Sequence, residues 1–201
     1  MTDLKKKRMK TVLKYTWPFY IVGAFVVFIL MGFIYKAAHP IPKYKTLTIF
    51  VSGEVTDSKK LSDDIYTKFK EKQIRSFSCV SASVYDTHYR TKLTVTGYNS
   101  ADVLIVPLSK LEGLENIDYV AIDLKESLVN EFYQGYTFYS KDQINYGVKV
   151  DKEKVNQYMT LPNEDCYMLL NGRSRNLGEY GIYSTIKEHD MALNVVKDWG
   201  M

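Results

Sequence analysis

Two arginines stand in one short turn of the chain, where they could bind an anion. The turn runs from Asn171 to Arg175, and its first dipeptide, Asn-Gly, is common in turns. The guanidinium groups of Arg173 and Arg175 could together clamp a carboxylate or a phosphate. A solvated loop that reverses the chain fits the same residues and is the more frequent use of such a turn. The sequence leaves both interpretations open.

The sequence shows no combination of side chains that indicates an enzyme. Its three histidines are far apart, and none has a partner at a metal-ligand spacing. The phosphate-loop, GxGxxG and GxSxG motifs are absent, and the pairs of adjacent carboxylates are typical of a solvated surface. We therefore expect a protein without enzymatic activity, and the sequence implies no metal and no cofactor.

Cys79 and Cys166 are the only cysteines in the sequence. Both follow the apolar segment described below, and an oxidising exterior would permit a disulfide between them. Both also stand in predicted strands, where a free cysteine behaves as a small apolar residue. The sequence favours two buried thiols, but it does not exclude a disulfide because it does not fix the distance between the two residues.

The basic residues are concentrated at the N-terminal end of the chain. Residues 1–45 contain nine lysines and arginines against one acid, Asp3. The remaining residues hold 18 basic groups against 22 acidic ones, although the isoelectric point of the whole chain is about 8.8. A body with net negative charge gains little from the release of phosphate counterions, so we expect no nucleic-acid partner.

Residues 17–35 form a predicted transmembrane helix. They are 19 consecutive uncharged positions, about the number that an α-helix needs to cross roughly 30 Å of hydrocarbon. Six basic residues precede this segment and three follow it, which places the N-terminus in the cytoplasm. We expect four aromatic side chains to contact the lipid bilayer: Trp17, Tyr20, Phe28 and Tyr35.

A cleaved signal peptide has the same basic start, but its apolar region is shorter, roughly 7 to 15 residues. Lys36 also stands where a small residue is needed for a cut after Ala38. We therefore expect a retained anchor in the cell membrane. The predicted parts are a cytoplasmic tail at 1–16, the helix at 17–35, a linker at 36–45 and an extracytoplasmic domain at 46–201.

The extracytoplasmic part predicts one three-layer α/β domain. Leu61, Ile65 and Phe69 recur at four-residue intervals behind a cap at Asp57 or Ser58, which indicates a helix. Strands flank this helix, and that order favours a largely parallel sheet. The predicted strands are 46–52, 74–85, 103–106, 136–139, 144–150 and 166–170, and further helices are expected near 124–132 and, behind Asp190, at 191–199.

Two segments together resemble a known family. TLTIFVSGEVTDSKKLSDDIYTKF begins at Thr46, and KLTVTGYNSADVLIVPLSKLEGL begins at Lys92. They are similar to the first lobe of the extracellular solute-binding proteins of ABC importers, especially the sugar-binding kind. In that family a small residue, Ala, Asp and an apolar run lead a strand to the ligand cleft, which Ala101, Asp102 and 103–107 match. YGVKV, residues 146–150, resembles the strand that passes through the hinge.

The resemblance covers residues 46–170 and implies a periplasmic-binding-protein fold with a transporter permease as partner. Such receptors enclose their ligand between two lobes, whereas the 156 residues after residue 45 suit one domain. One wall cannot enclose a sugar, so a small-molecule ligand stays uncertain.

Open α/β sheets bind ligands at the carboxyl ends of their strands. We therefore expect a binding role for the loops at that edge, although they could simply close the fold. The candidate ligand- or partner-binding residues are Ser52, Gly53, Glu54, Asp102, Pro107, Leu108, Ser109, Arg173 and Arg175.

Together these features predict a membrane-anchored extracytoplasmic binding or adaptor module, an accessory of an ABC-type sugar transporter. The alternative is a single-pass envelope sensor or assembly protein without a transport role.

Overall fold

The computed structural model describes residues 3–39, 41–114, 117–183 and 186–201. Its contacts divide the chain into two compact units, Met1–Ile41 and Pro42–Met201. Pro40, in the predicted linker, and the first two residues of the predicted tail lie outside the described residues.

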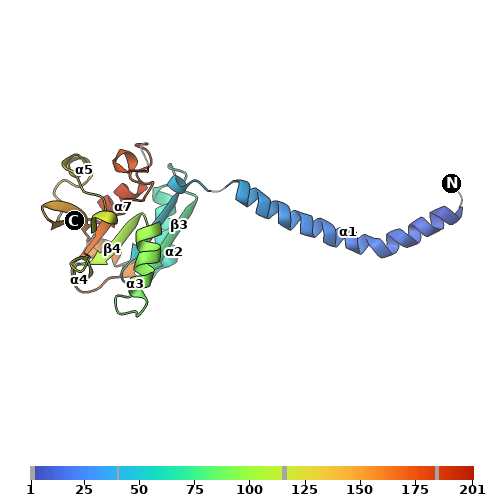
Figure 1. The fold of residues 1–201 in the computed structure, drawn as a ribbon, viewed down its shortest axis with the longest axis horizontal. Helices are drawn as coiled ribbons and strands as arrows, with labels where there is room; N and C mark the ends of the chain where they lie inside the picture. Colours follow the sequence, from blue (N-terminus) through green and yellow to red (C-terminus); the bar gives the residue numbers. More distant parts are fainter. Residues whose placement is uncertain (1–2, 40, 115–116, 184–185) are drawn as a thin grey trace. The chain divides into compact units, whose positions relative to one another are not determined.

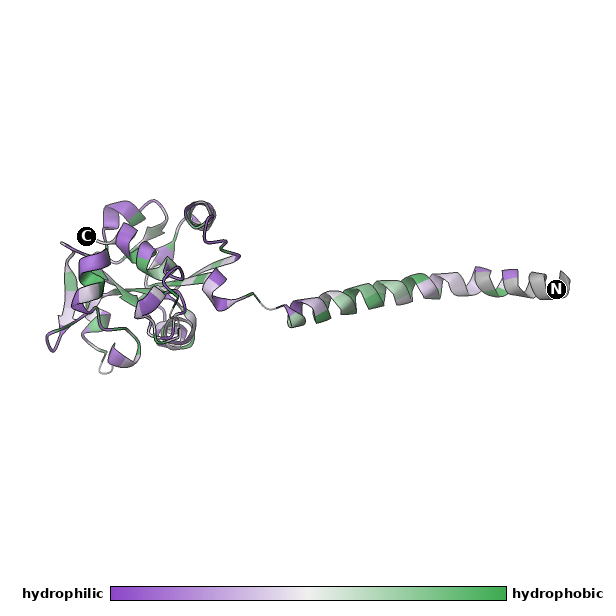
Figure 2. Ribbon diagram, turned by 90° about the horizontal axis from the view of Figure 1, so that it is seen from above, coloured by the Kyte–Doolittle hydropathy of each residue, from purple (hydrophilic) through white to green (hydrophobic). Residues whose placement is uncertain are grey.

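The first unit contains one helix, α1 (Asp3–Ala38). Its segment Lys14–Ala38 is, within the described ranges, the one helix long and apolar enough to cross a membrane. Figure 2 shows apolar residues concentrated in the C-terminal half of α1. The side chains of Trp17, Tyr20, Phe28 and Tyr35 are all exposed, and Phe28 is 82% exposed. The helix is longer than the predicted 17–35 and includes residues 36–38 of the predicted linker, because no glycine or proline interrupts them.

The second unit (Figure 1) is built on a six-stranded sheet. The strand order is β3-β1-β4-β8-β6-β5. The strands are β1 (Thr46–Val51), β3 (Ser76–Ser81), β4 (Val103–Pro107), β5 (Phe138–Lys141), β6 (Ile144–Lys149) and β8 (Cys166–Leu170). A separate antiparallel ribbon pairs β2 (Glu54–Val55) with β7 (Met159–Thr160). The α/β class predicted from the sequence is confirmed.

The prediction of a largely parallel sheet is wrong. β1 pairs in parallel with β3 and β4, whereas the pairings β4–β8, β8–β6 and β6–β5 are antiparallel. β5 and β6 are joined by Asp142 and Gln143, which both have positive φ values, 53° and 67°. A two-residue turn with positive φ at both positions closes a tight hairpin, so its strands must run antiparallel.

Helices cover both faces of the sheet. Ile49 and Val51 of β1 point into one hydrophobic cluster, and Phe50 between them points into the other. The first face is covered by α2 (Ser58–Lys68), α5 (Glu126–Phe132), α6 (Lys152–Val155) and α7 (Met191–Trp199). The second is covered by α3 (Tyr89–Lys92), η2 (Leu93–Tyr98), α4 (Leu108–Leu111) and η3 (Ile117–Tyr119). The short 3-10 turns η1 (Lys43–Lys45) and η4 (Gly178–Tyr180) lie in the connections.

The two predicted helix caps have different outcomes. The Asp57 carboxylate accepts a hydrogen bond from the Lys60 N–H at 2.9 Å, so it caps α2 as expected. Asp190 does precede α7, but its side chain makes no capping bond and contacts Lys72 instead. The ion pair with a lysine takes the carboxylate away from the free N–H groups of the helix.

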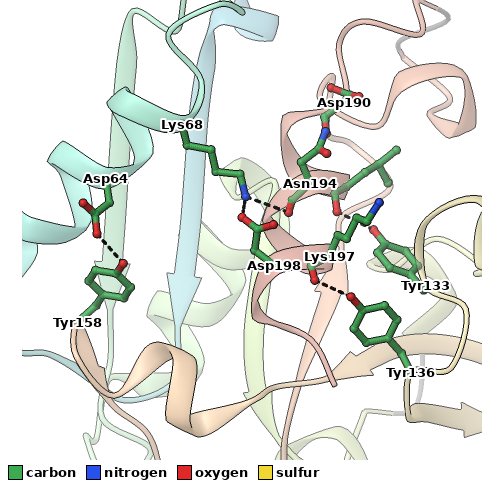
Figure 3. A network of polar contacts seen from close by, with 10 residues as sticks. Asp64, Lys68, Tyr133, Tyr136, Tyr158, Asp190, Asn194, Lys197 and Asp198 are labelled. Atoms are coloured by element: carbon green, nitrogen blue, oxygen red, sulfur yellow. Dashed lines mark hydrogen bonds and ion pairs between the residues drawn. The ribbon is translucent and has the colours of Figure 1, made fainter.

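The first face of the sheet is tied together by polar contacts around α7 (Figure 3). Backbone carbonyls of α7 accept hydrogen bonds from the hydroxyls of Tyr133 and Tyr136, at 3.1 and 2.8 Å. Lys68 of α2 contacts Asp198 of α7, and Tyr158 donates to Asp64 of α2 at 2.6 Å. The hollow between these elements is small, about 80 Å³. The contact between α2, Tyr158 and the end of α7 is therefore closely packed.

Both cysteines are free thiols, as the sequence favoured, although only Cys166 is fully buried. Cys79 lies on β3 and Cys166 on β8, with β1 and β4 between them. Three strand spacings amount to about 14 Å, twice the separation that a disulfide tolerates. Burial raises the pKa of Cys79 to about 12 and of Cys166 to about 11, so both remain protonated.

Candidate functional site

The candidate residues fall at two opposite edges of the sheet. Ser52 and Ser109 follow the carboxyl ends of the parallel strands β1 and β4. Asp102 precedes β4, and Arg173 and Arg175 follow β8, which runs antiparallel to β4, so these three lie at the amino edge. The structure therefore does not bring the predicted site residues together into one site.

The carboxyl edge borders a hollow of about 800 Å³, which we call the carboxyl-edge groove. It lies between the helical segment α3–η2 and the short helix α4. Its lining residues include Tyr89, Arg90, Leu93, Thr94, Val95, Tyr98, Ser109 and Lys110. Two basic side chains and two tyrosines thus face the groove, and the described residues of its lining include no acid, histidine or cysteine.

The wall α3–η2 packs on the sheet through residues spaced four apart, Tyr89, Leu93 and Gly97, all buried. A Cβ atom at Gly97 would lie 3.0 Å from Leu93 Cδ1 and 3.2 Å from Leu104 Cδ2. Glycine therefore allows the helical backbone to approach β4 closely. The segment continues as a π-helix in η2, and Val95 on its outer side is 59% exposed.

Tyr89 forms the floor of the groove. Its hydroxyl is hydrogen-bonded to the buried Ser52 Oγ at 2.8 Å, and the Lys110 ammonium lies 5.7 Å from the centre of its ring. Burial raises the pKa of Tyr89, with a smaller opposing effect from the Ser52 hydrogen bond, and burial raises the pKa of Tyr98 to about 12. Both phenols are therefore protonated at neutral pH, so they can donate hydrogen bonds.

Ser109 is held in place by Glu164, which sequence reasoning did not select. The Ser109 N–H and hydroxyl donate to the two carboxylate oxygens at 2.8 and 2.7 Å. The Leu108 N–H donates to the carbonyl of Asp165 at 2.9 Å. These bonds fix the start of α4 beside β8 and orient Ser109 at the rim of the groove.

The other carboxyl-edge candidates have structural contacts. Pro107 is buried and pairs with Cys166, and Leu108 packs against the second hydrophobic cluster. Glu54 belongs to the ribbon β2–β7. Gly53 approaches that ribbon so closely that a Cβ atom would lie 2.5 Å from the Thr160 carbonyl oxygen. None of these four lines the groove.

At the amino edge, Asp102 is the centre of a buried network. Its carboxylate accepts hydrogen bonds from the Thr48 N–H at 2.8 Å, the Ser174 hydroxyl at 2.5 Å and the Asn176 amide at 3.1 Å. Burial raises the pKa of Asp102 above its ordinary value, and the three hydrogen bonds oppose that rise. Protein groups therefore already occupy both carboxylate oxygens of Asp102. The network joins β1, β4 and the turn after β8.

Arg173 and Arg175 line a smaller hollow next to Asp102, about 230 Å³, which we call the amino-edge hollow. Lys43, Thr46, Asn99 and Ser100 are also part of its lining. The Arg173 guanidinium donates to Asn99 Oδ1 at 2.6 Å. The predicted turn at Asn171 is present, with its side-chain oxygen accepting from the Arg173 N–H at 2.9 Å.

Sequence reasoning missed the wall of the groove. Leu93 to Thr96 read LTVT, which is rich in β-branched residues, and this obscured a helical segment. The signal that could have found it is the four-residue spacing of Tyr89, Leu93 and Gly97. Among the residues that the structure describes, no group of His, Cys, Asp or Glu could hold a metal ion.

Comparison with family models and with curated proteins finds no match. Two solved structures are weakly similar. One, described as a complex with acarbose, is 17% identical with a TM-score of 0.37, covering 52% of this chain and 29% of that chain. The other, an ABC substrate-binding protein from Listeria monocytogenes in complex with cycloalternan, is 15% identical with a TM-score of 0.31, covering 56% and 32%. The chain thus spans about a third or less of those proteins, and neither likeness establishes a function for it.

Proposed function

We propose that the protein is a membrane-anchored binding or adaptor module whose outer domain recognises a neighbouring membrane protein through the carboxyl-edge groove. The observation that carries this proposal is the lining of the groove. Arg90 and Lys110 supply positive charge, and Tyr89 and Tyr98 lie beside them. Among the described residues that line the groove there is no acid, and both oxygens of Glu164 at the rim accept hydrogen bonds from Ser109. Such a surface suits an acidic or hydroxyl-rich partner.

The apolar segment of α1 supports the anchor. It is exposed along its length, and basic residues are more numerous before it than after it. We propose that residues 1–16 are cytoplasmic and that the domain at 46–201 is outside. A tether of this kind raises the effective concentration of the domain for a partner in the same membrane, so a modest intrinsic affinity is sufficient.

The openness of the groove favours a protein partner over a free sugar. Small-molecule pockets bury most of their ligand, and a groove that is only partly enclosed cannot do so without a second wall. A partner protein would supply that wall. On the family resemblance of residues 46–170, we propose that the partner is the permease of an ABC-type sugar transporter.

The test is purification of the tagged full-length chain from membranes of its native host in mild detergent, followed by identification of the proteins that remain bound. We expect permease subunits with the wild type and at least a tenfold loss of them with Arg90→Glu. Arg90 is exposed on α3, and its backbone carbonyl bond to Thr94 does not depend on the side chain.

Lys59→Glu is the matched control, because it makes the same charge change on the exposed start of α2, away from the groove. Equal losses with both variants would refute a role for the groove. Recovery of other envelope proteins, without transporter subunits, would replace the transport role by that of a sensor or assembly protein.

A further inference from the structure

The amino-edge hollow carries positive charge that the fold offsets only in part, through the interaction of Lys43 with Asp102. Lys43 and Arg175 are exposed, and within the described part of the chain their side chains make no hydrogen bond or ion pair. Arg173 uses one guanidinium nitrogen on Asn99 and keeps its other donors. The one acid in the lining, Asp102, is occupied by internal donors.

This local charge contrasts with the rest of the domain. Residues 46–201 have more acidic than basic groups, so the domain as a whole is repelled by an anionic surface. Three basic side chains around one hollow provide a specific place where an anion can approach. Arginine in particular presents paired donors that match the oxygens of a phosphate.

The length of the connecting chain limits the distance between Lys43 and the end of α1. Lys43 is five residues after Ala38, the last residue of the helix, and five residues span at most about 18 Å. If α1 crosses the bilayer as proposed above, Lys43 is confined to the neighbourhood of the lipid headgroups. Arg173 and Arg175 share the hollow with Lys43 and are confined with it.

Two exposed apolar side chains follow a chain segment that begins at the same edge. The base of this segment is closed by a hydrogen bond of 2.7 Å from the Gly178 N–H to the His189 carbonyl, and the His189 ring stacks on Tyr44 at 3.9 Å. Beyond the base, Ile182 is 77% and Tyr183 59% exposed. Exposed apolar and tyrosine side chains next to basic ones are typical of surfaces that bind the membrane interface.

We propose that the amino edge of the domain docks on anionic lipid headgroups, with Lys43, Arg173 and Arg175 binding lipid phosphate. This inference rests on the membrane anchoring proposed above. Because the two edges lie at opposite ends of β1 and β4, docking turns the carboxyl-edge groove away from the bilayer. The lipid surface would thereby orient the groove toward the exposed part of a membrane partner.

The experiment is hydrogen exchange of the full-length chain in nanodiscs of phosphatidylcholine alone or with one third phosphatidylglycerol. We expect slower exchange of residues 43–46 and 173–176 in the anionic discs. The double variant Lys43→Gln/Arg175→Gln should remove this protection, with the docked-to-undocked ratio falling roughly fivefold for each basic residue lost. Lys59→Glu, which makes the same two-unit change of charge far from the hollow, should retain it.

Three results would overturn the proposal. One is equal exchange in the two kinds of disc. Another is a loss of protection with Lys59→Glu as large as with the double variant. The third is protection of the same residues in neutral discs after addition of glycerol phosphate, to the same extent as in anionic discs. That result would assign the hollow to a free phosphate ligand. Incorporation of the chain into neutral discs tests the membrane anchor separately. None of these outcomes affects the recovery of partner proteins, which tests the groove through Arg90.

Discussion

The two edges of the central sheet differ in how their polar groups are used. At the carboxyl edge, Tyr98 and Lys110 face an open groove of about 800 Å³. At the amino edge, Asp102 is buried and its two oxygens accept three hydrogen bonds from the protein. The comparison shows that the acid at one end of the strands is used in internal hydrogen bonds, while tyrosine and lysine side chains at the other end line a groove.

The first way to test this difference is to remove the Asp102 network. Asp102→Ala leaves the Thr48 N–H and the Ser174 hydroxyl without their acceptor, and the Asn176 amide keeps only its bond to the Thr46 carbonyl. We therefore expect a loss of about 3 kcal/mol in the free energy of unfolding. Urea unfolding of the detergent-solubilised full-length chain measures it. Ser100→Ala, an exposed position of the same hollow, should stay within about 0.5 kcal/mol of the wild type. Similar losses for both would contradict a specific role of the network.

The second prediction concerns the contact that positions the groove wall. Gly97→Val places a branched side chain against Leu93 and Leu104, so we expect a destabilisation of about 1 to 3 kcal/mol. The same variant should also weaken partner recovery, since the wall is pushed away from β4. A stable variant with unchanged partner recovery would show that the close packing of η2 does not shape the groove.

The smallest expected effect is a pH dependence at the amino edge. Burial raises the pKa of Asp102 in the folded state, so folding favours its protonated form. The stabilisation from this group is complete below its ordinary pKa and is lost as the pH rises through the raised value.

We therefore expect the difference in unfolding free energy between the wild type and Asp102→Asn to decrease as the pH rises above about 4, the ordinary pKa of an aspartate, since asparagine does not titrate. Unfolding curves at several pH values measure it. A difference that grows with pH would mean that the network stabilises the carboxylate anion instead.

The sequence predicted those parts of the fold that depend on local pattern. The apolar run at residues 103–106 and the β-branched start at Thr46 identified the central strands, and Asp57 identified the start of α2. The directions of the later strands were not predictable, because hydrophobic alternation is the same in parallel and antiparallel strands. The hairpin at Asp142 depends on positive φ values in residues other than glycine, which sequence patterns indicate poorly.

The candidate site was predicted only in part. Ser109 and Ser52 belong to the carboxyl edge, where the general rule for α/β sheets placed them. Arg173 was grouped with them because its chemistry suits an anion, but the reversed direction of β8 puts it at the other edge. Glu164 was missed because its partner, Ser109, is distant in sequence. The two residues come into contact only because β4 pairs with β8.

The central claim is that the carboxyl-edge groove is the partner-binding surface of a membrane-tethered domain. The most direct measurement is photo-crosslinking in intact membranes, with p-benzoylphenylalanine replacing Val95 in the groove or Asn130 on the exposed side of α5. The account predicts a discrete crosslink to a membrane protein from position 95 and none from position 130. Equal crosslinking from both positions, or a product from position 130 alone, would contradict it.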